Sequence, residues 1–280
     1  MKIGITAFIT DNGMLPDELG TEIENRGFES LFLPEHSHIP VSRATPYPYG
    51  ERLPDPYFRA WDPFVALAGA AVATKKLLLG TGVSLVAQRD TIQTAKEVSC
   101  IDQLSKGRFI FGVGTGWNYE EMKNHGVEPK IRGSLVDEKL NALKRIWTSD
   151  EAQFHGKHVS FDPIYQWPKP VQKPFPKIYV GGVGYAAVKR AVRLGMGWMP
   201  IGASTPCEVD SQLRIPSSLG EPGMPVTAAL VQRDQEVLRR YAEWDVERVT
   251  FFLPPKNRSQ SLHRLDELAD LSVKHGFLTS

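Results

Sequence analysis

The sequence predicts an α/β protein with the architecture of a (β/α)8 barrel, the TIM-barrel fold. Eight short apolar runs rich in β-branched and aromatic residues recur along the 280 residues. Most of them are continuously apolar, which is typical of strands buried on both faces of a parallel sheet. Helical patterns separate them, and a typical barrel needs about 250 residues. An open, doubly wound sheet is the competing arrangement, but the count of eight strands favours the barrel.

The predicted strands and helices follow one another along the chain. The strands are IGITAF, SLFLP, LLLGTGV, RFIFGVG, KIYVGG, GWMP, VTAALV and VTFFLP. Helical patterns cover residues 16–26, 63–74, 91–104, 135–147, 186–194, 232–244 and 262–274. In the fourth of these, Val136, Leu140, Leu143 and Trp147 recur at the spacing of one helix face. The first begins at a proline and is closed by Gly27, as helix termini often are.

Two stretches interrupt this alternation. Residues 37–61 form a long loop after the second strand, rich in proline and tyrosine. The run QFHGKHVSF reads as a small hairpin turning near Gly156, before the fifth strand, and a proline-rich connector follows it. We interpret both as insertions in a single barrel domain spanning residues 1–280, without internal repeats.

Charge and composition narrow the function. The net charge of +1 comes from 33 basic and 32 acidic residues spread along the chain, which disfavours nucleic acid or an anionic membrane as partner. A small-molecule substrate is expected instead. No apolar run is long enough to span a membrane and the chain opens on a strand-like segment, so we expect a cytoplasmic protein. The two cysteines, Cys100 and Cys207, cannot form a disulfide framework or a zinc site alone.

Residues 31–40, LFLPEHSHIP, place a carboxylate and an imidazole at the end of the second predicted strand. Active sites of such barrels lie at the carboxyl ends of the strands. A lone histidine is more often structural, but the acidic neighbour and the position favour His36, with Glu35, as a catalytic residue. His38, His155 and His158 are interpreted as loop or hairpin residues. No third ligand with metal spacing accompanies them, so no metal site is expected.

Glycines end four of the predicted strands. Each alone reads as turn punctuation, but together they would let a flat ring or a phosphate approach the backbone closely. The helix beginning near Tyr185 would offer free N–H groups to an anion. The run GVGYAA matches the dinucleotide fingerprint, yet no acidic residue closes a following strand at the required spacing, so the match is weak.

Several longer stretches carry a resemblance in combination. They are GFESLFLPEHSHIP, AWDPFVALAGAAVAT, LLLGTGVSLVAQRD, IDQLSKGRFIFGVGTGWNYEEM, the helix ending LKRIW, FPKIYVGG and GMGWMPIG. The chain resembles the bacterial luciferase-like family of flavin and deazaflavin oxidoreductases, which are (β/α)8 barrels, over nearly its whole length. It is most similar to the short branch assigned to the deazaflavin coenzyme F-420 rather than FMN, and its own short length agrees.

The resemblance implies a role for each matching residue. Glu35 and His36 would lie beside the coenzyme ring near its hydride-carrying carbon. Gly82 and Val83 would be joined by a cis peptide pressed against the back of the ring. The loop containing Gly114, Gly116, Trp117 and Asn118 would contact the ring and its side chain. The phosphate would be bound by the backbone of Gly181, Gly182, Val183, Gly202 and Ala203.

One motif departs from the family. Where relatives usually read Gly-Asp-Gly-Trp, this chain has Met196 in place of the aspartate, between Gly195 and Gly197. That aspartate would help the turn into the sixth strand, so its loss questions local structure more than chemistry. The resemblance also implies a homodimer.

The expected function is hydride transfer between coenzyme F-420 and a small organic substrate. A deazaflavin transfers hydride and reacts poorly with oxygen. The protein therefore needs only to hold the hydride donor and acceptor close together and to transfer one proton, and histidine suits the proton transfer. The loop over residues 37–61, with Tyr47, Tyr49, Tyr57 and Phe58, would be the lid or else a dimer contact or a solvated loop. The alternatives are an FMN-dependent luciferase-like monooxygenase using reduced flavin and O2, and a non-catalytic flavin-binding barrel.

Overall fold

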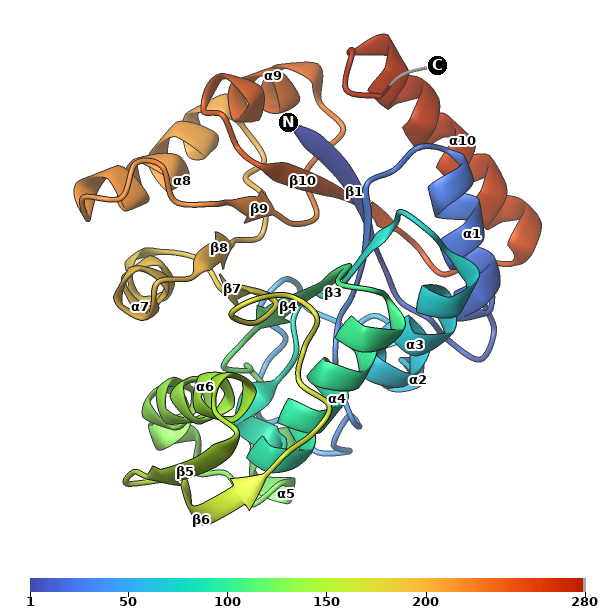
Figure 1. Ribbon diagram of the computed structural model, residues 1–280. Coiled ribbons are helices and arrows are strands. Elements are labelled where there is room, and N and C mark those ends of the chain that lie inside the picture. The colour runs from blue at the N-terminus through green and yellow to red at the C-terminus, as the bar shows by residue number, and fades with distance from the viewer. Residues whose placement is uncertain (279–280) are drawn as a thin grey trace.

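The computed structural model describes residues 1–278, which form a nearly closed barrel of parallel strands inside a ring of helices (Figure 1). The barrel strands run in the order β8-β7-β4-β3-β2-β1-β10-β9. Bridges between Trp198 and Val226 and between Ile201 and Ala229 join β8 to β9. The strands are β1 (Lys2–Ala7), β2 (Ser30–Leu33), β3 (Leu78–Thr81), β4 (Phe109–Val113), β7 (Lys177–Gly181), β8 (Gly197–Met199), β9 (Thr227–Ala228) and β10 (Arg248–Leu253). Each overlaps one of the eight predicted runs, and β1 and β10 begin one residue earlier than predicted; this confirms the fold class.

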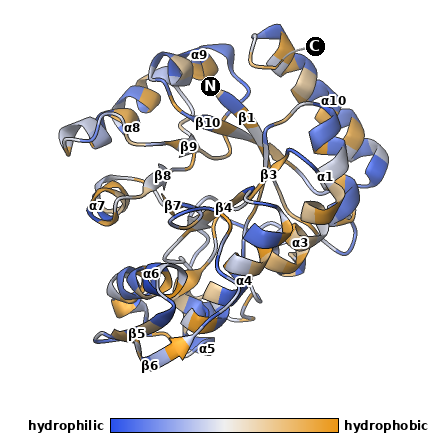
Figure 2. Ribbon diagram, in the orientation of Figure 1, coloured by the Kyte–Doolittle hydropathy of each residue, from blue (hydrophilic) through white to orange (hydrophobic). Residues whose placement is uncertain are grey.

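The continuous apolar runs are explained by burial on two sides. All four residues of β2 and all five of β4 are buried. Alternate residues of a strand point to opposite faces, so one set fills the barrel and the other packs beneath the helices. Figure 2 shows apolar residues on the strands and the inner sides of the helices, while polar residues dominate the outer sides.

The helices confirm the predicted alternation and add one element. The longer helices are α1 (Pro16–Asn25), α3 (Pro63–Ala73), α4 (Thr91–Leu104), α6 (Arg132–Thr148), α7 (Tyr185–Leu194), α8 (Pro206–Ser218), α9 (Gln235–Glu243) and α10 (Arg258–Lys274). Sequence reasoning missed α8, between β8 and β9. A capping box of Thr205 and Glu208 marks its start, but Pro216 inside its last turn argues against a helix when the sequence is read alone. The helix predicted over residues 232–244 begins later, because Asp234 caps α9.

Both insertions have the predicted places. The hairpin of β5 (Glu151–His155) and β6 (Ser160–Tyr165) turns at Gly156 and lies beside α6 at the edge of the molecule (Figure 1). The loop after β2 contains the single helical turn α2 (Pro56–Arg59) and returns to the barrel where the N–H of Trp61 bonds to the carbonyl of Ile9 at 2.9 Å. Within residues 1–278, no helix has the length and apolar character needed to cross a membrane.

Met196, which replaces the usual aspartate, fits its surroundings. The preceding Gly195 takes a left-handed conformation with φ of 64° at the end of α7. Met196 is buried, and its N–H bonds to the carbonyl of Ala191 at 2.9 Å. The turn into β8 is therefore built from a glycine conformation and an apolar anchor, and it needs no carboxylate.

Candidate active site

His36 lies just past the carboxyl end of β2 and is only 7% exposed. Both nitrogens of its ring are engaged. Nδ1 lies 2.7 Å from Oε2 of Glu121, and Nε2 accepts a hydrogen bond from the indole N–H of Trp117 at 3.3 Å. The ring is thus fixed from two sides by residues that follow β4.

Glu121 is the functional residue that sequence reasoning missed. It belongs to the short helix α5 (Tyr119–Asn124), is 0% exposed, and accepts the backbone N–H of Ser37 on its other oxygen at 3.1 Å. Asn118 caps α5 by accepting the N–H of Glu121 at 3.1 Å. The spacing of Asn118 and Glu121 is a helix-start signal in the sequence. Nothing local, however, could indicate that the carboxylate would meet His36.

Glu35 is buried on the other side of the same segment. One of its oxygens accepts the hydroxyl of Ser84 and the N–H of Leu85, both at 2.7 Å. The other pairs with Nε of Arg89 at 2.5 Å. Glu35 had been expected either to orient His36 or to bond to the coenzyme ring. The expectation that Glu35 orients His36 is wrong, because Glu121 makes the contact to the imidazole. The bond from Glu35 to the coenzyme ring stays a prediction.

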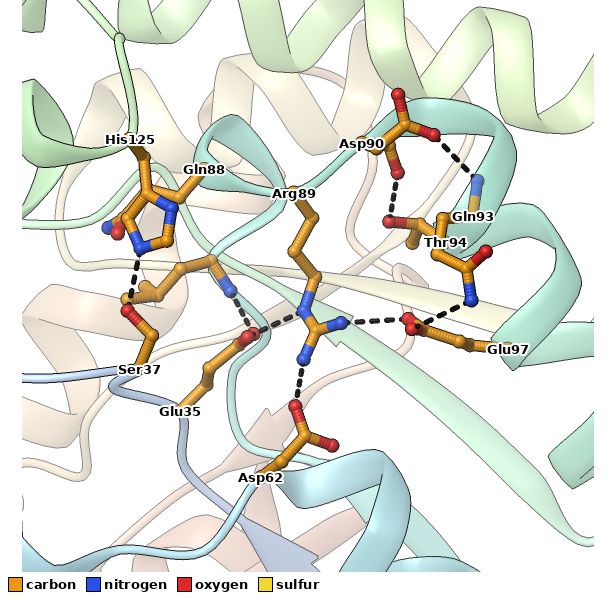
Figure 3. Close-up of a pocket in the computed structure, with 11 residues that line it drawn as sticks. Glu35, Ser37, Asp62, Gln88, Arg89, Asp90, Gln93, Thr94, Glu97 and His125 are labelled. Atoms are coloured by element: carbon orange, nitrogen blue, oxygen red, sulfur yellow. Dashed lines mark hydrogen bonds and ion pairs between the residues drawn. The ribbon is translucent and has the colours of Figure 1, made fainter.

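Arg89 is the centre of a charged cluster around Glu35. Figure 3 shows its guanidinium between the carboxylates of Glu35, Asp62 and Glu97. Burial opposes the charge of Arg89, but these carboxylates, with Glu35 the strongest, hold its pKa above the usual value. Burial raises the pKa of Glu97, although Arg89 works in the opposite direction. A cavity of about 260 Å³ lies here, and the ring contacts of His36 are made elsewhere.

The peptide between Gly82 and Val83 is cis, as the resemblance implied. Gly114, which directly follows β4, and Gly181, at the end of β7, enclose the side chain of Val83. A Cβ added to Gly114 would lie 2.5 Å from Val83, and one added to Gly181 would lie 2.7 Å from it. Both distances are shorter than real carbon contacts, so the two glycines leave the space that Val83 occupies.

The loop after β4 contains an unsatisfied donor. Gly116 has a φ of 78°, and a Cβ there would lie 2.7 Å from the end of Met122. Asn118 is 1% exposed, and its Nδ2 finds no hydrogen-bond partner among residues 1–278. A buried donor without a partner costs stability unless a ligand satisfies it. A ring carbonyl of a flavin or deazaflavin would fit this donor, so the loop suits the coenzyme that the resemblance implies.

The expected phosphate-binding backbone divides into two groups. Gly182 and Gly184 have positive φ values and lead into α7, whose first turn has no side-chain cap. Val183 between them is 59% exposed. By contrast, the N–H of Gly202 bonds to Ala229 at 2.6 Å and that of Ala203 to the hydroxyl of Tyr241 at 2.7 Å. In this structure the first group has the better geometry for an anion, because the N–H of Gly182 makes only a long bond of 3.3 Å to the carbonyl of Met199, whereas the bonds of Gly202 and Ala203 are short.

The loop over residues 37–61 brings aromatic rings to His36. The ring of Tyr57 lies 5.3 Å from that of His36 and 4.9 Å from that of Phe8. Tyr47 lies 5.7 Å from Trp117, and the two tyrosine hydroxyls are 3.2 Å apart. Burial raises the pKa of Tyr57. The aromatic part of the loop therefore covers the imidazole.

Not every aromatic residue of the loop takes part. Tyr49 and Phe58, also expected in the lid, are 57% and 55% exposed. As for metals, no cluster of three potential ligands occurs in the part of the chain that the structure describes.

Comparison with known proteins adds independent findings. A family model described as luciferase-like monooxygenase matches residues 17–214. An uncharacterized protein of Mycobacterium tuberculosis is 35% identical over 280 residues, 96% of this chain and 98% of that protein. An FMNH2-dependent dimethylsulfone monooxygenase of Pseudomonas putida is 38% identical over 103 residues, 36% of this chain and 28% of that enzyme. An F-420-dependent glucose-6-phosphate dehydrogenase of Nakamurella multipartita is 27% identical over 200 residues, 68% of this chain and 52% of that enzyme.

Solved structures share the fold at lower identity. The monooxygenase RslO1 from Streptomyces bottropensis superimposes with a TM-score of 0.77 and 17% identity, covering 99% of this chain and 100% of that one. An F-420-dependent secondary alcohol dehydrogenase, in complex with an F-420–acetone adduct, gives a TM-score of 0.74 and 16% identity, covering 98% and 99%. At such identities the likeness concerns the fold alone.

Proposed function

The chain belongs to the luciferase-like monooxygenase family of flavin- and F-420-dependent enzymes, and we propose that it transfers a hydride between coenzyme F-420 and a small organic substrate. One observation carries the proposal. A buried histidine at a strand end is held by a carboxylate on one nitrogen, and its other nitrogen faces aromatic side chains of the barrel mouth. That arrangement suits a proton acceptor or donor next to a hydride step.

The bound coenzyme would supply a carbon that accepts or donates the hydride. The protein's own groups would do the rest. Nε2 of His36 takes or gives the substrate proton, and Tyr47 and Tyr57 exclude water above it. The unpartnered Nδ2 of Asn118 would bond to the coenzyme ring, and the backbone of Gly182 and Val183 would face its phosphate.

One consideration supports the deazaflavin over FMN. The similarity to the F-420-dependent relative extends over 68% of this chain, against 36% for the FMNH2-dependent one. The latter similarity, at 38% identity, supports the alternative of a monooxygenase using reduced FMN and O2. A non-catalytic flavin-binding barrel is disfavoured, because it would have no need for a buried His36–Glu121 pair.

The test is a fluorescence titration of the purified protein with each coenzyme. We expect F-420 to bind at least roughly tenfold more tightly than FMN, which is a difference of about 1.4 kcal/mol. Equal affinities, or tighter binding of FMN, would contradict the proposed coenzyme. Turnover with reduced FMN and O2 would then favour the monooxygenase.

We also propose a homodimer formed through α3. Val65 and Val72 lie seven residues apart, on one face of this helix, and are 66% and 68% exposed. Ala68 and Gly69 between them are only half-buried, so the outward face of α3 is apolar and made of small side chains that suit a second copy. Sedimentation should give a dimer for the wild type and a monomer for Val72→Glu; a monomeric wild type would contradict the proposal.

A further inference from the structure

We propose that Glu121 is a positioning residue that fixes His36 in the tautomer protonated at Nδ1. Nε2 is then always presented as a proton acceptor. The catalytic meaning of this inference rests on the proposed function, whereas the tautomer itself can be tested in the protein without any coenzyme. Three contacts carry the argument: the one between His36 and Glu121 is buried, and the other two are partly buried.

The tautomer follows from the donors around the ring. The indole N–H of Trp117 can only donate, so Nε2 of His36, 3.3 Å away, must accept. A neutral imidazole has one N–H group, which is then on Nδ1. It donates to Oε2 of Glu121 at 2.7 Å. The opposite tautomer would set two N–H groups of His36 and Trp117 against each other.

Only a carboxylate satisfies both neighbours of Glu121. Its Oε1 accepts the backbone N–H of Ser37 at 3.1 Å while Oε2 accepts from His36. A glutamine has one oxygen. If that oxygen accepts from Ser37, its NH2 group must donate to Nδ1 of His36, and the proton of the ring moves to Nε2, where it opposes the N–H of Trp117. If the oxygen accepts from His36 instead, the NH2 group opposes the N–H of Ser37. Glu121 is 0% exposed and His36 7%, so water has little room to relieve the conflict.

The fixed tautomer defines what His36 does in the proposed reaction. A substrate hydroxyl would replace the indole of Trp117 at Nε2. Its proton would pass to Nε2 as the O–H bond breaks, the hydride would leave the adjacent carbon with its electron pair for the oxidised deazaflavin, and a C=O bond would form. The substrate is oxidised and the coenzyme reduced. The positive charge that appears on His36 lies against the carboxylate of Glu121, which stabilises it.

The first experiment uses nitrogen-15 NMR of the coenzyme-free protein labelled at histidine, with the His36 signals assigned from their loss in His36→Ala. We expect a protonated Nδ1 and an unprotonated Nε2 in the wild type, and a population of rings protonated at Nε2 in Glu121→Gln. Glu138→Gln is the matched control, because Glu138 also accepts backbone N–H groups, at the distant hairpin. A wild-type ring protonated at Nε2, or an unchanged ring in Glu121→Gln, would overturn the proposal.

The second experiment measures single-turnover hydride transfer at saturating coenzyme. Glu121→Gln should be slower by about 10²- to 10⁴-fold with little change in coenzyme affinity, while Glu121→Asp, which keeps both acceptors, should recover most of the rate. Equal losses for Gln and Asp, together with a lower melting temperature, would mean that Glu121 only stabilises the fold. Failure of both coenzymes to bind would refute the proposed function and leave the NMR result standing.

Discussion

Glu35 and Glu121 are two buried carboxylates on opposite sides of the segment that follows β2. Glu35 is paired with Arg89, whose charge is permanent, in a cluster with two further carboxylates. Glu121 is paired with His36, whose imidazole has a nitrogen that can accept a proton. A carboxylate next to a permanent charge is suited to holding structure, whereas one next to an imidazole can take part in proton transfer.

The backbone explains why neighbouring residues have such different surroundings. Successive residues of an extended segment point to opposite sides, so Glu35 and His36 diverge although they are adjacent in sequence. Glu35 turns to the charged cavity and His36 to the aromatic barrel mouth. Their adjacency in sequence suggested a single catalytic pair, but in the structure the two side chains have different partners.

The largest expected effect is on hydride transfer and comes from removing the imidazole that Glu121 contacts. His36→Ala should slow hydride transfer by roughly 10² to 10⁴, the usual loss for a general acid or base, and leave folding and coenzyme affinity largely intact. The measurement is single-turnover transfer at saturating coenzyme together with the melting temperature. Near-normal transfer with a depressed melting temperature would show that His36 is structural.

A comparable change on the other side should act on stability instead. Arg89→Met leaves Glu35, Asp62 and Glu97 without their common partner, and removing one member of a buried pair costs about 3–5 kcal/mol of unfolding free energy. Urea denaturation measures this loss. Adding Glu35→Gln to Arg89→Met should recover part of it. If Arg89→Met unfolds like the wild type, the cluster does not hold the end of β2.

Sequence reasoning predicted the barrel because the signals for strands and helices are local. Apolar runs such as RFIFGVG and termination signals such as Gly27 act within a few residues. The partner of His36 could not be predicted in this way, because Glu121 is 85 positions further along the chain. The pairing of Glu35 with Arg89 could not be predicted either, because nothing in the sequence indicates where Arg89 lies relative to the segment that follows β2.

A third, smaller effect concerns the backbone that lines the mouth. Gly114→Ala would press its Cβ against Val83, and such overpacking typically costs about 1–3 kcal/mol. Urea denaturation should show this loss in Gly114→Ala and a recovery in the double variant with Val83→Ala, which removes the atom that the new Cβ meets. Equal stability of single and double variants would mean that the backbone yields instead.

The smallest expected effect is a change of stability with pH that is caused by Lys139. Nζ of Lys139 donates to the carbonyls of Ala87 and Arg89, and burial lowers the pKa of Lys139 to about 8. An unfolded lysine stays protonated to higher pH, so between pH 8 and roughly pH 9 the unfolded state binds more protons and stability should rise by about 1 kcal/mol. In Lys139→Met that rise should be missing. A falling stability over this interval, specific to Lys139, would contradict the assignment.

The pairing of the first and last barrel strands has a consequence for biosynthesis. β1 pairs with β10 over six residue pairs, from Lys2 with Arg248 to Ala7 with Leu253. During synthesis on the ribosome, β1 can pair with β2 long before β10, its other neighbour, has been made. Its open edge is a template for pairing with other chains during that time. The ladder between β1 and β10 thus leaves an unpaired strand edge in the nascent chain until β10 has been synthesised.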